Sequence, residues 1–361
     1  MLSRSVSVLE SGLRDGRHIG AQLYVSLNGE VLGDIAIGEA RPGVLMTPET
    51  IMLWLSAGKP LVAAAIAMLW ERGLLQLDDL VTQHIPEFAA NGKGAITIRH
   101  ILTHTAGFRG GETGWPDHPW DEIIQRVVNL RQEPSRVPGK KAGYHLQTSW
   151  FVLAELIRRL DGRAFEQFMR EEIFVPLGMN DSWFAITAGE YRALGNRLGI
   201  MHSTEKGVAE ATTLDSEASC TVPRPGGGAH GPARELGRFY EMMLGHGRLG
   251  AARILLPQTV EAMVARHRTG MYDNTFKHAM DWGLAFIINS PTPDVKMPYG
   301  FGLHASPRAF GHGGAMSTGG LADPEHGLVA AYVFNGMAGE VRHQERVQAL
   351  TAAIYEDVGL I

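Results

Sequence analysis

The stretch MLWLSAGKPLVAAAIAMLWERG, residues 52–73, decides the fold of this chain. Ser56 and Lys59 stand three residues apart at its start, and an apolar run follows them directly. Residues three apart share one face of a helix, so a helix from about Ser56 brings the hydroxyl and the amine together. Pro60 fits the first turn, where its missing N–H has no partner inside the helix. The pattern predicts a buried helix with a reactive pair at its N-terminus.

The chemistry of this pair depends on the charge of the lysine. An exposed lysine has a pKa of about 10.4 and is a poor base at neutral pH. Desolvation disfavours the ammonium form, so a buried Lys59 can accept the proton of Ser56 and create a nucleophile. The alternative is a surface lysine at a helix start. Ser203 and Lys206 have the same spacing, but they lie among polar residues with no apolar helix behind them.

Composition places the chain among ordinary globular proteins: 361 residues, 45% hydrophobic and 20% charged. The formal charge of −5 argues against nucleic acid or an anionic membrane as a partner. The single cysteine, Cys220, excludes an internal disulfide and a cysteine-only metal site. No apolar run reaches the roughly 18 residues of a membrane span, and residues 1–20 lack the pattern of a signal peptide. We therefore expect a cytoplasmic protein.

The order of elements predicts an α+β fold. A terminal helix precedes two short β-rich runs around Asn28-Gly29, the strongest local hairpin signal. The middle of the chain is mainly helical, and the last third contains β-rich runs at 282–289, 299–305, 309–316 and 327–336 before a helix at 340–356. Both ends then form one antiparallel sheet flanked by helices. We expect this lobe to comprise 1–60 and 225–361, with a helical lobe at 61–224 inserted and the active site in the cleft between them.

Two further motifs follow Ser56 and Lys59 in order. Tyr144 lies in PGKKAGYHLQTSWFVLAELIRRLDG (138–162), in a loop before a strong helix, and His312 lies in FGHGGAM (310–316). Together with LTHTAGF (102–108), these stretches resemble the class C β-lactamase family. Its relatives include penicillin-binding DD-peptidases, family VIII carboxylesterases and transesterifying acyltransferases. The resemblance runs from about residue 20 to the C-terminus and implies the β-lactamase/transpeptidase fold.

The resemblance also implies a role for each matching residue. Ser56 would be the nucleophile, Lys59 its proton acceptor, and Tyr144 a partner base or the acid that protonates the leaving group. His312 would help to bind substrate or tune Tyr144. The backbone N–H groups of Ser56 and Ala315 would form the oxyanion hole. Gly313 and Gly314 would let substrate approach the strand edge closely.

Position 146 departs from the family pattern, because Leu146 stands where the family often has Asn or Ser. His145 or Gln147 would have to fill that substrate-binding role, and β-lactam hydrolysis is disfavoured. A second, reversed pair of motif-like sequences lies in RTGMYDN (268–274), which we interpret as a loop bordering the site. His100 and His104 lack a third ligand and are interpreted as structural, so neither a metal nor a cofactor is expected.

These observations lead us to expect a serine hydrolase that works through an acyl-enzyme on a small carbonyl substrate, as an esterase or amidase. An acyltransferase that passes the acyl group to an amine or alcohol is the first alternative. A β-lactamase or D-amino-acid peptidase is the second, and a non-catalytic ligand-binding protein on the same fold is the third. Residue patterns do not define the acyl group, the acceptor or the oligomeric state.

Overall fold

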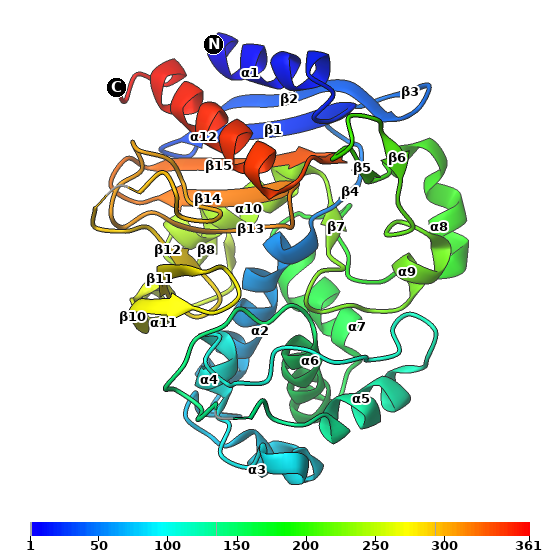
Figure 1. The fold of residues 1–361 in the computed structure, drawn as a ribbon, viewed down its shortest axis with the longest axis vertical. Coiled ribbons are helices and arrows are strands. Elements are labelled where there is room, and N and C mark those ends of the chain that lie inside the picture. The colour runs from blue at the N-terminus through cyan, green and yellow to red at the C-terminus, as the bar shows by residue number, and fades with distance from the viewer. Residues whose placement is uncertain (1, 135, 293) are drawn as a thin grey trace.

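The computed structural model describes residues 2–134, 136–292 and 294–361. Its centre is an antiparallel sheet to which both ends of the chain contribute (Figure 1). The described strands of this sheet follow the order β10–β11–β12–β13–β14–β15–β1–β2–β3. Their bounds are β1 Gly20–Leu27, β2 Glu30–Arg41, β3 Val44–Leu45, β10 Arg268–Asp273, β11 His278–Trp282, β12 Ile287–Ile288, β13 Phe310–Gly313, β14 Thr318–Asp323 and β15 Leu328–Phe334. The predicted sheet is confirmed.

The hairpin signal at Asn28-Gly29 joins β1 to β2. Asn28 has φ 53° and Gly29 has φ 81°, the left-handed pair that a tight two-residue turn requires. The turn sets Leu27 opposite Glu30. On its other side β1 pairs with β15 across more than 300 residues of sequence, and Ala21 faces Phe334.

Both faces of the sheet are buried, which explains the continuous apolar runs of its central strands. Ala330 and Phe334 of β15 pack toward the terminal helices α1 (Ser3–Arg14) and α12 (Glu340–Asp357). Ala331 and Val333 of the same strand pack with α10 (Ala233–Leu244) on the opposite face. The two termini lie together at one edge of the molecule, where Ser5 donates to Asp357 (Figure 1).

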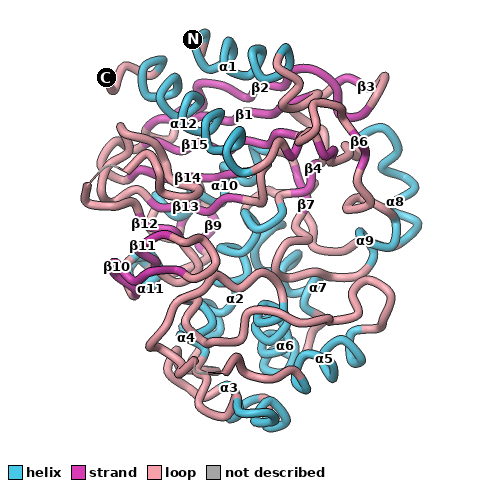
Figure 2. Tube along the Cα trace, in the orientation of Figure 1, coloured by secondary structure: helices cyan, strands magenta, loops and turns pink. Residues whose placement is uncertain are grey.

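The helical lobe lies on the other side of the molecule, where loops and short helices surround α2 (Figure 2). Helix α2 (Lys59–Glu71) is buried from Lys59 to Leu69, so it is apolar on all its faces, and it packs on α6. The lobe also contains α3 Val81–His84, η2 Pro86–Gly92, α4 Ile98–Leu102, α5 Trp120–Asn129, α6 Thr148–Asp161, α7 Phe165–Met169 and the π-helical turn η3 Arg170–Phe174.

The remaining elements of the described chain are short. They are β4 Met52–Leu53, η1 Leu55–Gly58, α8 Ala188–Leu194, η4 Gly195–Arg197, β5 His202–Ser203, β6 Glu210–Ala211, α9 Glu217–Thr221, β7 His230–Gly231, β8 Arg248–Leu249, β9 Ala252–Arg253, α11 Pro257–Val264 and β16 Gly336–Met337. The proposed lobe boundaries at residues 60 and 225 stay a prediction.

One β-rich run of the sequence is not a strand. Residues 299–305, YGFGLHA, form an irregular segment. Tyr299 has φ 56° and Gly302 has φ 85°, and left-handed residues so close together do not fit a strand. The expectation of a strand here was wrong. Across the part of the chain that the structure describes, the helices are too short or too polar to cross a membrane.

The close packing of α10 on the sheet leads us to predict how a substitution in α10 changes the free energy of unfolding. A Cβ at Gly237 would lie 2.3 Å from Cδ1 of the buried Tyr24 ring, so Gly237→Ala overpacks this interface. We expect it to lower the free energy of unfolding by about 1–3 kcal/mol, although alanine favours helices. Gly189→Ala in α8 is the matched control, because the nearest atom to its Cβ is 3.8 Å away. Urea denaturation compares the two, and equal effects would contradict the packing argument.

Candidate active site

The turn that carries Ser56 is strained and firmly held. Leu55, the residue before Ser56, has φ 51°, a left-handed conformation that costs a non-glycine residue about 1–2 kcal/mol. The buried Trp54 fixes the entry to this turn: its backbone N–H donates to Ala229 and its indole Nε1 donates to Gly231, both at 2.8 Å. Such strain persists only where surrounding contacts over-determine it. The result is a Ser56 hydroxyl presented at the start of α2.

Lys59 is fully buried beneath Ser56. Its Nζ lies 2.9 Å from Ser56 Oγ, 2.9 Å from the carbonyl oxygen of Leu146, and in a short hydrogen bond with the carbonyl oxygen of Gly226. Burial lowers the pKa of Lys59 well below its usual value, and the positive charge of Arg224 lowers it further. A neutral amine has two N–H bonds and one lone pair. The two carbonyls match the N–H bonds, which leaves the lone pair for the serine proton.

Tyr144 lies against this amine with its phenol kept protonated. Lys59 Nζ lies 5.2 Å from the centre of its ring. Burial, the largest effect, raises the pKa of Tyr144 above its ordinary value. A hydrogen bond with Ser56 lowers this pKa, and the negative charge of Asp273 raises it. A protonated phenol is a proton donor, so the structure favours the acid role over the base role among the two that the resemblance left open.

The loop of Tyr144 is held by a buried ion pair that the sequence patterns did not reveal. Asp273 Oδ1 accepts the backbone N–H of Tyr144 at 3.0 Å and that of Thr275 at 2.9 Å. Its Oδ2 accepts from Arg268 at 3.0 Å, and both side chains are buried. The stretch 268–274, interpreted as a loop bordering the site, is instead mostly edge strand β10, whose last residue anchors the loop of Tyr144.

His312 lies on β13 in a neutral form. Its Nδ1 is 2.7 Å from the carbonyl oxygen of Gly313, and burial lowers its pKa to about 3. Its ring lies 5.8 Å from that of Tyr144, centre to centre. A neutral imidazole beside Lys59 adds no positive charge to the site.

The strand edge after His312 approaches the Ser56 turn closely. A Cβ at Gly314 would lie 2.3 Å from the carbonyl oxygen of Trp54, so only glycine allows this contact. The backbone N–H groups of Ser56 and Ala315 have no hydrogen-bond acceptor among the described residues. Both residues line one cavity, where two unpaired donors suit a developing oxyanion.

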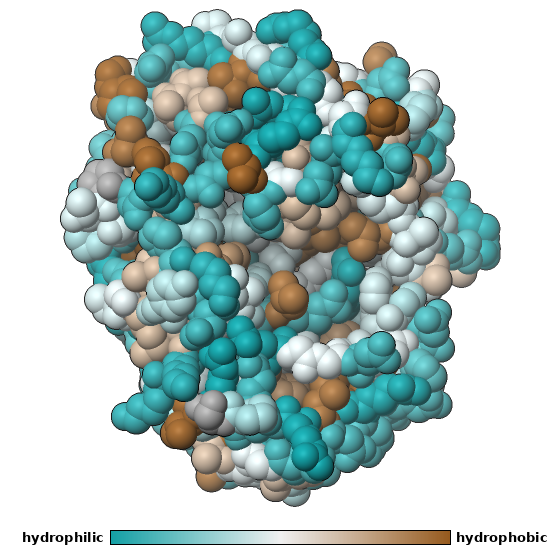
Figure 3. Space-filling view, viewed as in Figure 1, coloured by the Kyte–Doolittle hydropathy of each residue, from teal (hydrophilic) through white to brown (hydrophobic). Residues whose placement is uncertain are grey.

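This cavity has a volume of about 310 Å³. The predicted site residues that line it are Ser56, Tyr144, Leu146, His312, Gly313 and Ala315. The other walls, which sequence reasoning missed, are Thr275, Phe276, Ile287, Pro298, Tyr299, Glu340 and Gln344. Figure 3 shows the molecular face hollowed near its centre, between the strands and the helical lobe. These added residues come from loops, from strand β12 and from the start of α12, where local patterns carry no sign of a shared cavity.

Three neighbours of Tyr144 differ in their placement. Leu146 is 58% exposed on the cavity wall, and its carbonyl binds Lys59. His145 is fully buried: its Nδ1 lies 3.0 Å from Ser149 Oγ, and its backbone N–H donates to His104. Neither His145 nor Gln147 is among the residues that line the cavity. The structure therefore does not bring these two side chains to the candidate site.

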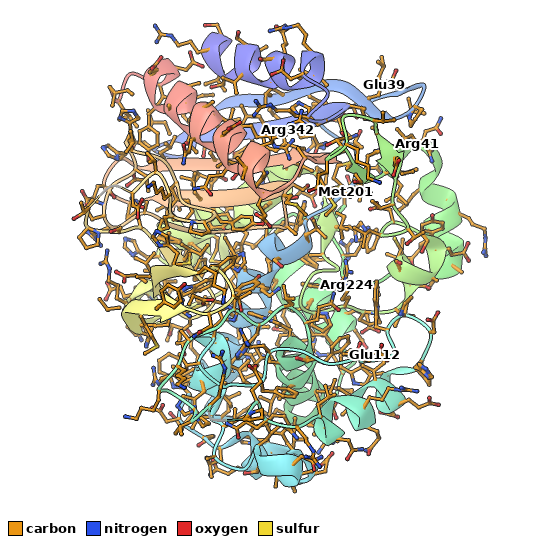
Figure 4. The ribbon with its side chains drawn as sticks, viewed as in Figure 1. Glu39, Arg41, Glu112, Met201, Arg224 and Arg342 are labelled. Atoms are coloured by element: carbon orange, nitrogen blue, oxygen red, sulfur yellow. The ribbon has the colours of Figure 1, made fainter. Side chains whose placement is uncertain are left out.

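Arg224 is buried near Lys59 and holds the glycine-rich turn that contacts this amine. Its Nη2 donates to the carbonyl of Gly227 at 2.7 Å, and its guanidinium carbon lies 4.4 Å from the centre of the Trp115 ring. It is buried on the segment after α9, near the junction of the lobes (Figure 4). The neighbouring Gly226 gives its carbonyl to Lys59. In the sequence, only the Pro- and Gly-rich run at 223–232 marks this segment, and such a run indicates a turn rather than a contact with Lys59.

The ion pair of Asp273 with Arg268, which holds the loop of Tyr144, leads to a second prediction. Asp273→Asn leaves the buried Arg268 without its counter-charge, so we expect the free energy of unfolding to fall by about 3–5 kcal/mol. Asp78→Asn is the control, because the pair of Asp78 with Arg99 is exposed and is worth at most about 1 kcal/mol. Denaturant titration of both variants measures the two losses of unfolding free energy. A loss for Asp273→Asn no larger than that for Asp78→Asn would contradict the anchoring role.

Comparisons with known proteins agree with this fold. The family model described as Beta-lactamase matches residues 6–353. The chain is 26% identical to Esterase/beta-lactamase LipL of Mycobacterium tuberculosis, over 88% of this chain and 77% of that protein. It is 26% identical to Esterase EstB of Burkholderia gladioli, over 80% and 79%. A penicillin-binding protein homologue from Caulobacter crescentus superposes with a TM-score of 0.78 at 28% identity, covering 98% of this chain and 97% of that one. The chain therefore belongs to the β-lactamase family.

Proposed function

We propose that this protein is an esterase- or amidase-type hydrolase that acts on a small carbonyl compound through a Ser56 acyl-enzyme. One observation carries the proposal: the fully buried amine of Lys59 lies 2.9 Å from Ser56 Oγ, and its other two partners are carbonyl oxygens. Nothing in that arrangement stabilises an ammonium as a carboxylate would. The esterase relatives support the same reaction class.

Acylation begins with transfer of the Ser56 proton to Nζ of Lys59 as Oγ attacks the substrate carbonyl carbon. The carbonyl oxygen takes up the negative charge and binds the backbone N–H groups of Ser56 and Ala315; one such donor is commonly worth about 3–4 kcal/mol. The bond to the leaving group then breaks. Tyr144 protonates the leaving oxygen or nitrogen, and the Lys59 ammonium returns a proton to Tyr144, which leaves both groups as they began.

Water resolves the acyl-enzyme by the reverse sequence. It gives a proton to the same relay, attacks the ester carbonyl and releases Ser56 with its hydroxyl restored. Transfer to an organic alcohol or amine is the second candidate, and it is favoured by the apolar cavity wall of Leu146, Phe276, Ile287 and Pro298. Turnover of an aryl ester in the presence of a primary alcohol distinguishes the two, because transfer yields a new ester in place of the free acid.

The nucleophile is tested by covalent labelling. A serine-reactive fluorophosphonate should add one group to the protein, at Ser56, and peptide mapping by mass spectrometry locates it. Ser56→Ala should abolish both labelling and ester turnover while shifting the thermal midpoint little, because a small polar group at a cavity is not part of the core. Ser203→Ala is the matched control, since Ser203 also has a lysine three residues later. Label on Ser203, or none on Ser56, would refute the assignment.

The base is tested by replacing Lys59 with arginine. Arginine keeps a positive charge but does not lose its proton at accessible pH, so Lys59→Arg should be almost as inactive as Lys59→Ala. In the wild type, the pKa of Lys59 is lowered, so the neutral base is lost only as pH falls through that lowered value. We expect the acylation rate to rise with pH well below 10.5 and then level off.

Pre-steady-state release of an aryl alcohol from the wild type and both variants, across pH, measures these rates. An arginine variant that acylates near the wild-type rate would show that Lys59 supplies charge rather than accepting a proton. A wild-type rate that still climbs near the pKa of an exposed lysine would contradict the effect of burial.

A further inference from the structure

The cavity wall beyond the nucleophile carries one carboxylate and a row of aromatic rings. Glu340, in the first turn of α12, lines the cavity together with Phe276 and Tyr299. The rings of Tyr144 and Phe276 lie 4.7 Å apart, and those of Phe276 and Tyr299 lie 5.7 Å apart, centre to centre. Three rings therefore form a continuous wall that ends at Glu340.

The carboxylate of Glu340 is connected to the strand edge by one hydroxyl group. Tyr299 donates to Glu340 at 2.9 and 3.0 Å, and its oxygen accepts the backbone N–H of Met316 at 3.3 Å. Met316 directly follows Ala315, the proposed oxyanion donor. This chain of hydrogen bonds links the carboxylate of Glu340 to the strand edge that carries the proposed oxyanion donor.

No described side chain supplies Glu340 with a cationic partner. Glu340 has no ion pair with the described lysines, arginines or histidines. Lys59 and His312, the basic groups nearest the nucleophile, are both buried with lowered pKa values. His343, on the same helix, is buried with its pKa lowered too, and Arg346 donates to the carbonyls of Met316 and Gly336.

The alternative roles of Glu340 account for only part of this arrangement. A carboxylate in a first helical turn stabilises the helix dipole, but this requires neither a cavity nor aromatic neighbours. Gln344, one turn further on, is already engaged with the carbonyls of Val295 and Met297. Glu340 is exposed as a whole residue, but its carboxyl group is partly desolvated in the cavity, which raises its pKa above the usual value; the hydrogen bond from Tyr299 acts in the opposite direction. Carboxylate and rings together have the chemistry of an ammonium-binding site.

We propose that Glu340, with the rings of Phe276 and Tyr299, forms a subsite that selects substrates carrying an ammonium group, quaternary ammonium included, and disfavours substrates carrying a carboxylate. This inference rests on the proposed function and names its substrate class. The aromatic faces attract the cation through their quadrupoles, and Glu340 supplies the counter-charge. A substrate carboxylate bound here would be repelled by the negative charge of Glu340.

Matched esters test the subsite. Each ammonium ester carries a trimethylammonium group, and its neutral counterpart carries a tert-butyl group of nearly the same shape; the group sits on the acyl chain in one pair and on the alcohol in the other. We expect wild-type kcat/KM to favour the ammonium ester by about tenfold or more in at least one pair. Glu340→Gln should reduce that ratio to near one. Glu345→Gln on the same helix is the control, because Glu345 pairs with Arg17 outside the cavity, and it should keep the ratio.

Binding separates the failure of this inference from the failure of the proposed function. Calorimetric titration of Ser56→Ala with both esters of each pair reports affinity without turnover, and Ser56→Ala/Glu340→Gln should lose the preference. Preferential binding without turnover by the wild type would overturn the hydrolase and leave the subsite standing. Turnover with equal ratios for wild type and Glu340→Gln, or a wild-type preference for the neutral tert-butyl esters, would overturn the subsite and leave the hydrolase standing.

Discussion

The arrangement of this site depends on the burial of one amine. Lys59 contacts Ser56 on its own turn, Leu146 in the loop before α6, and Gly226 in the glycine-rich turn before β7. These residues lie up to 167 positions apart in sequence. A charged ammonium in this place would lose its hydration without a carboxylate to compensate it, so the protein favours the neutral form. The same burial that gives α2 its stability therefore sets the protonation state on which the proposed chemistry depends.

The rest of the site is fixed by close backbone contacts. The left-handed Leu55 turns the chain toward the cavity, and the buried Trp54 holds it on both sides. Gly314 comes so near the carbonyl of Trp54 that no side chain fits between them. Strain at one residue is tolerated because packing of its neighbours determines the local geometry. As a consequence, Ser56 and Ala315 present to one cavity two backbone N–H groups that have no acceptor in the described part of the chain.

Burial acts in opposite directions on the two proton carriers. It lowers the pKa of Lys59 and raises that of Tyr144, because in each case it disfavours the charged form. The amine is then free to accept a proton and the phenol is ready to donate one. A shared low-dielectric environment thus favours the neutral amine and the protonated phenol that the proposed base and acid roles require.

The sequence by itself determined the elements that depend on local patterns. The Ser-x-x-Lys spacing, the hairpin at Asn28-Gly29 and the continuous apolar strands predicted the sheet, the buried α2 and the pairing of the chain ends, because periodicity and turn chemistry are local properties. Tertiary structure alone decided four further features. It placed Asp273 under Tyr144, it directed His145 away from the cavity and left residues 299–305 irregular, and it brought Glu340 beside the aromatic wall. Each of these depends on contacts between distant segments and on the desolvation they cause, which no short stretch of sequence records.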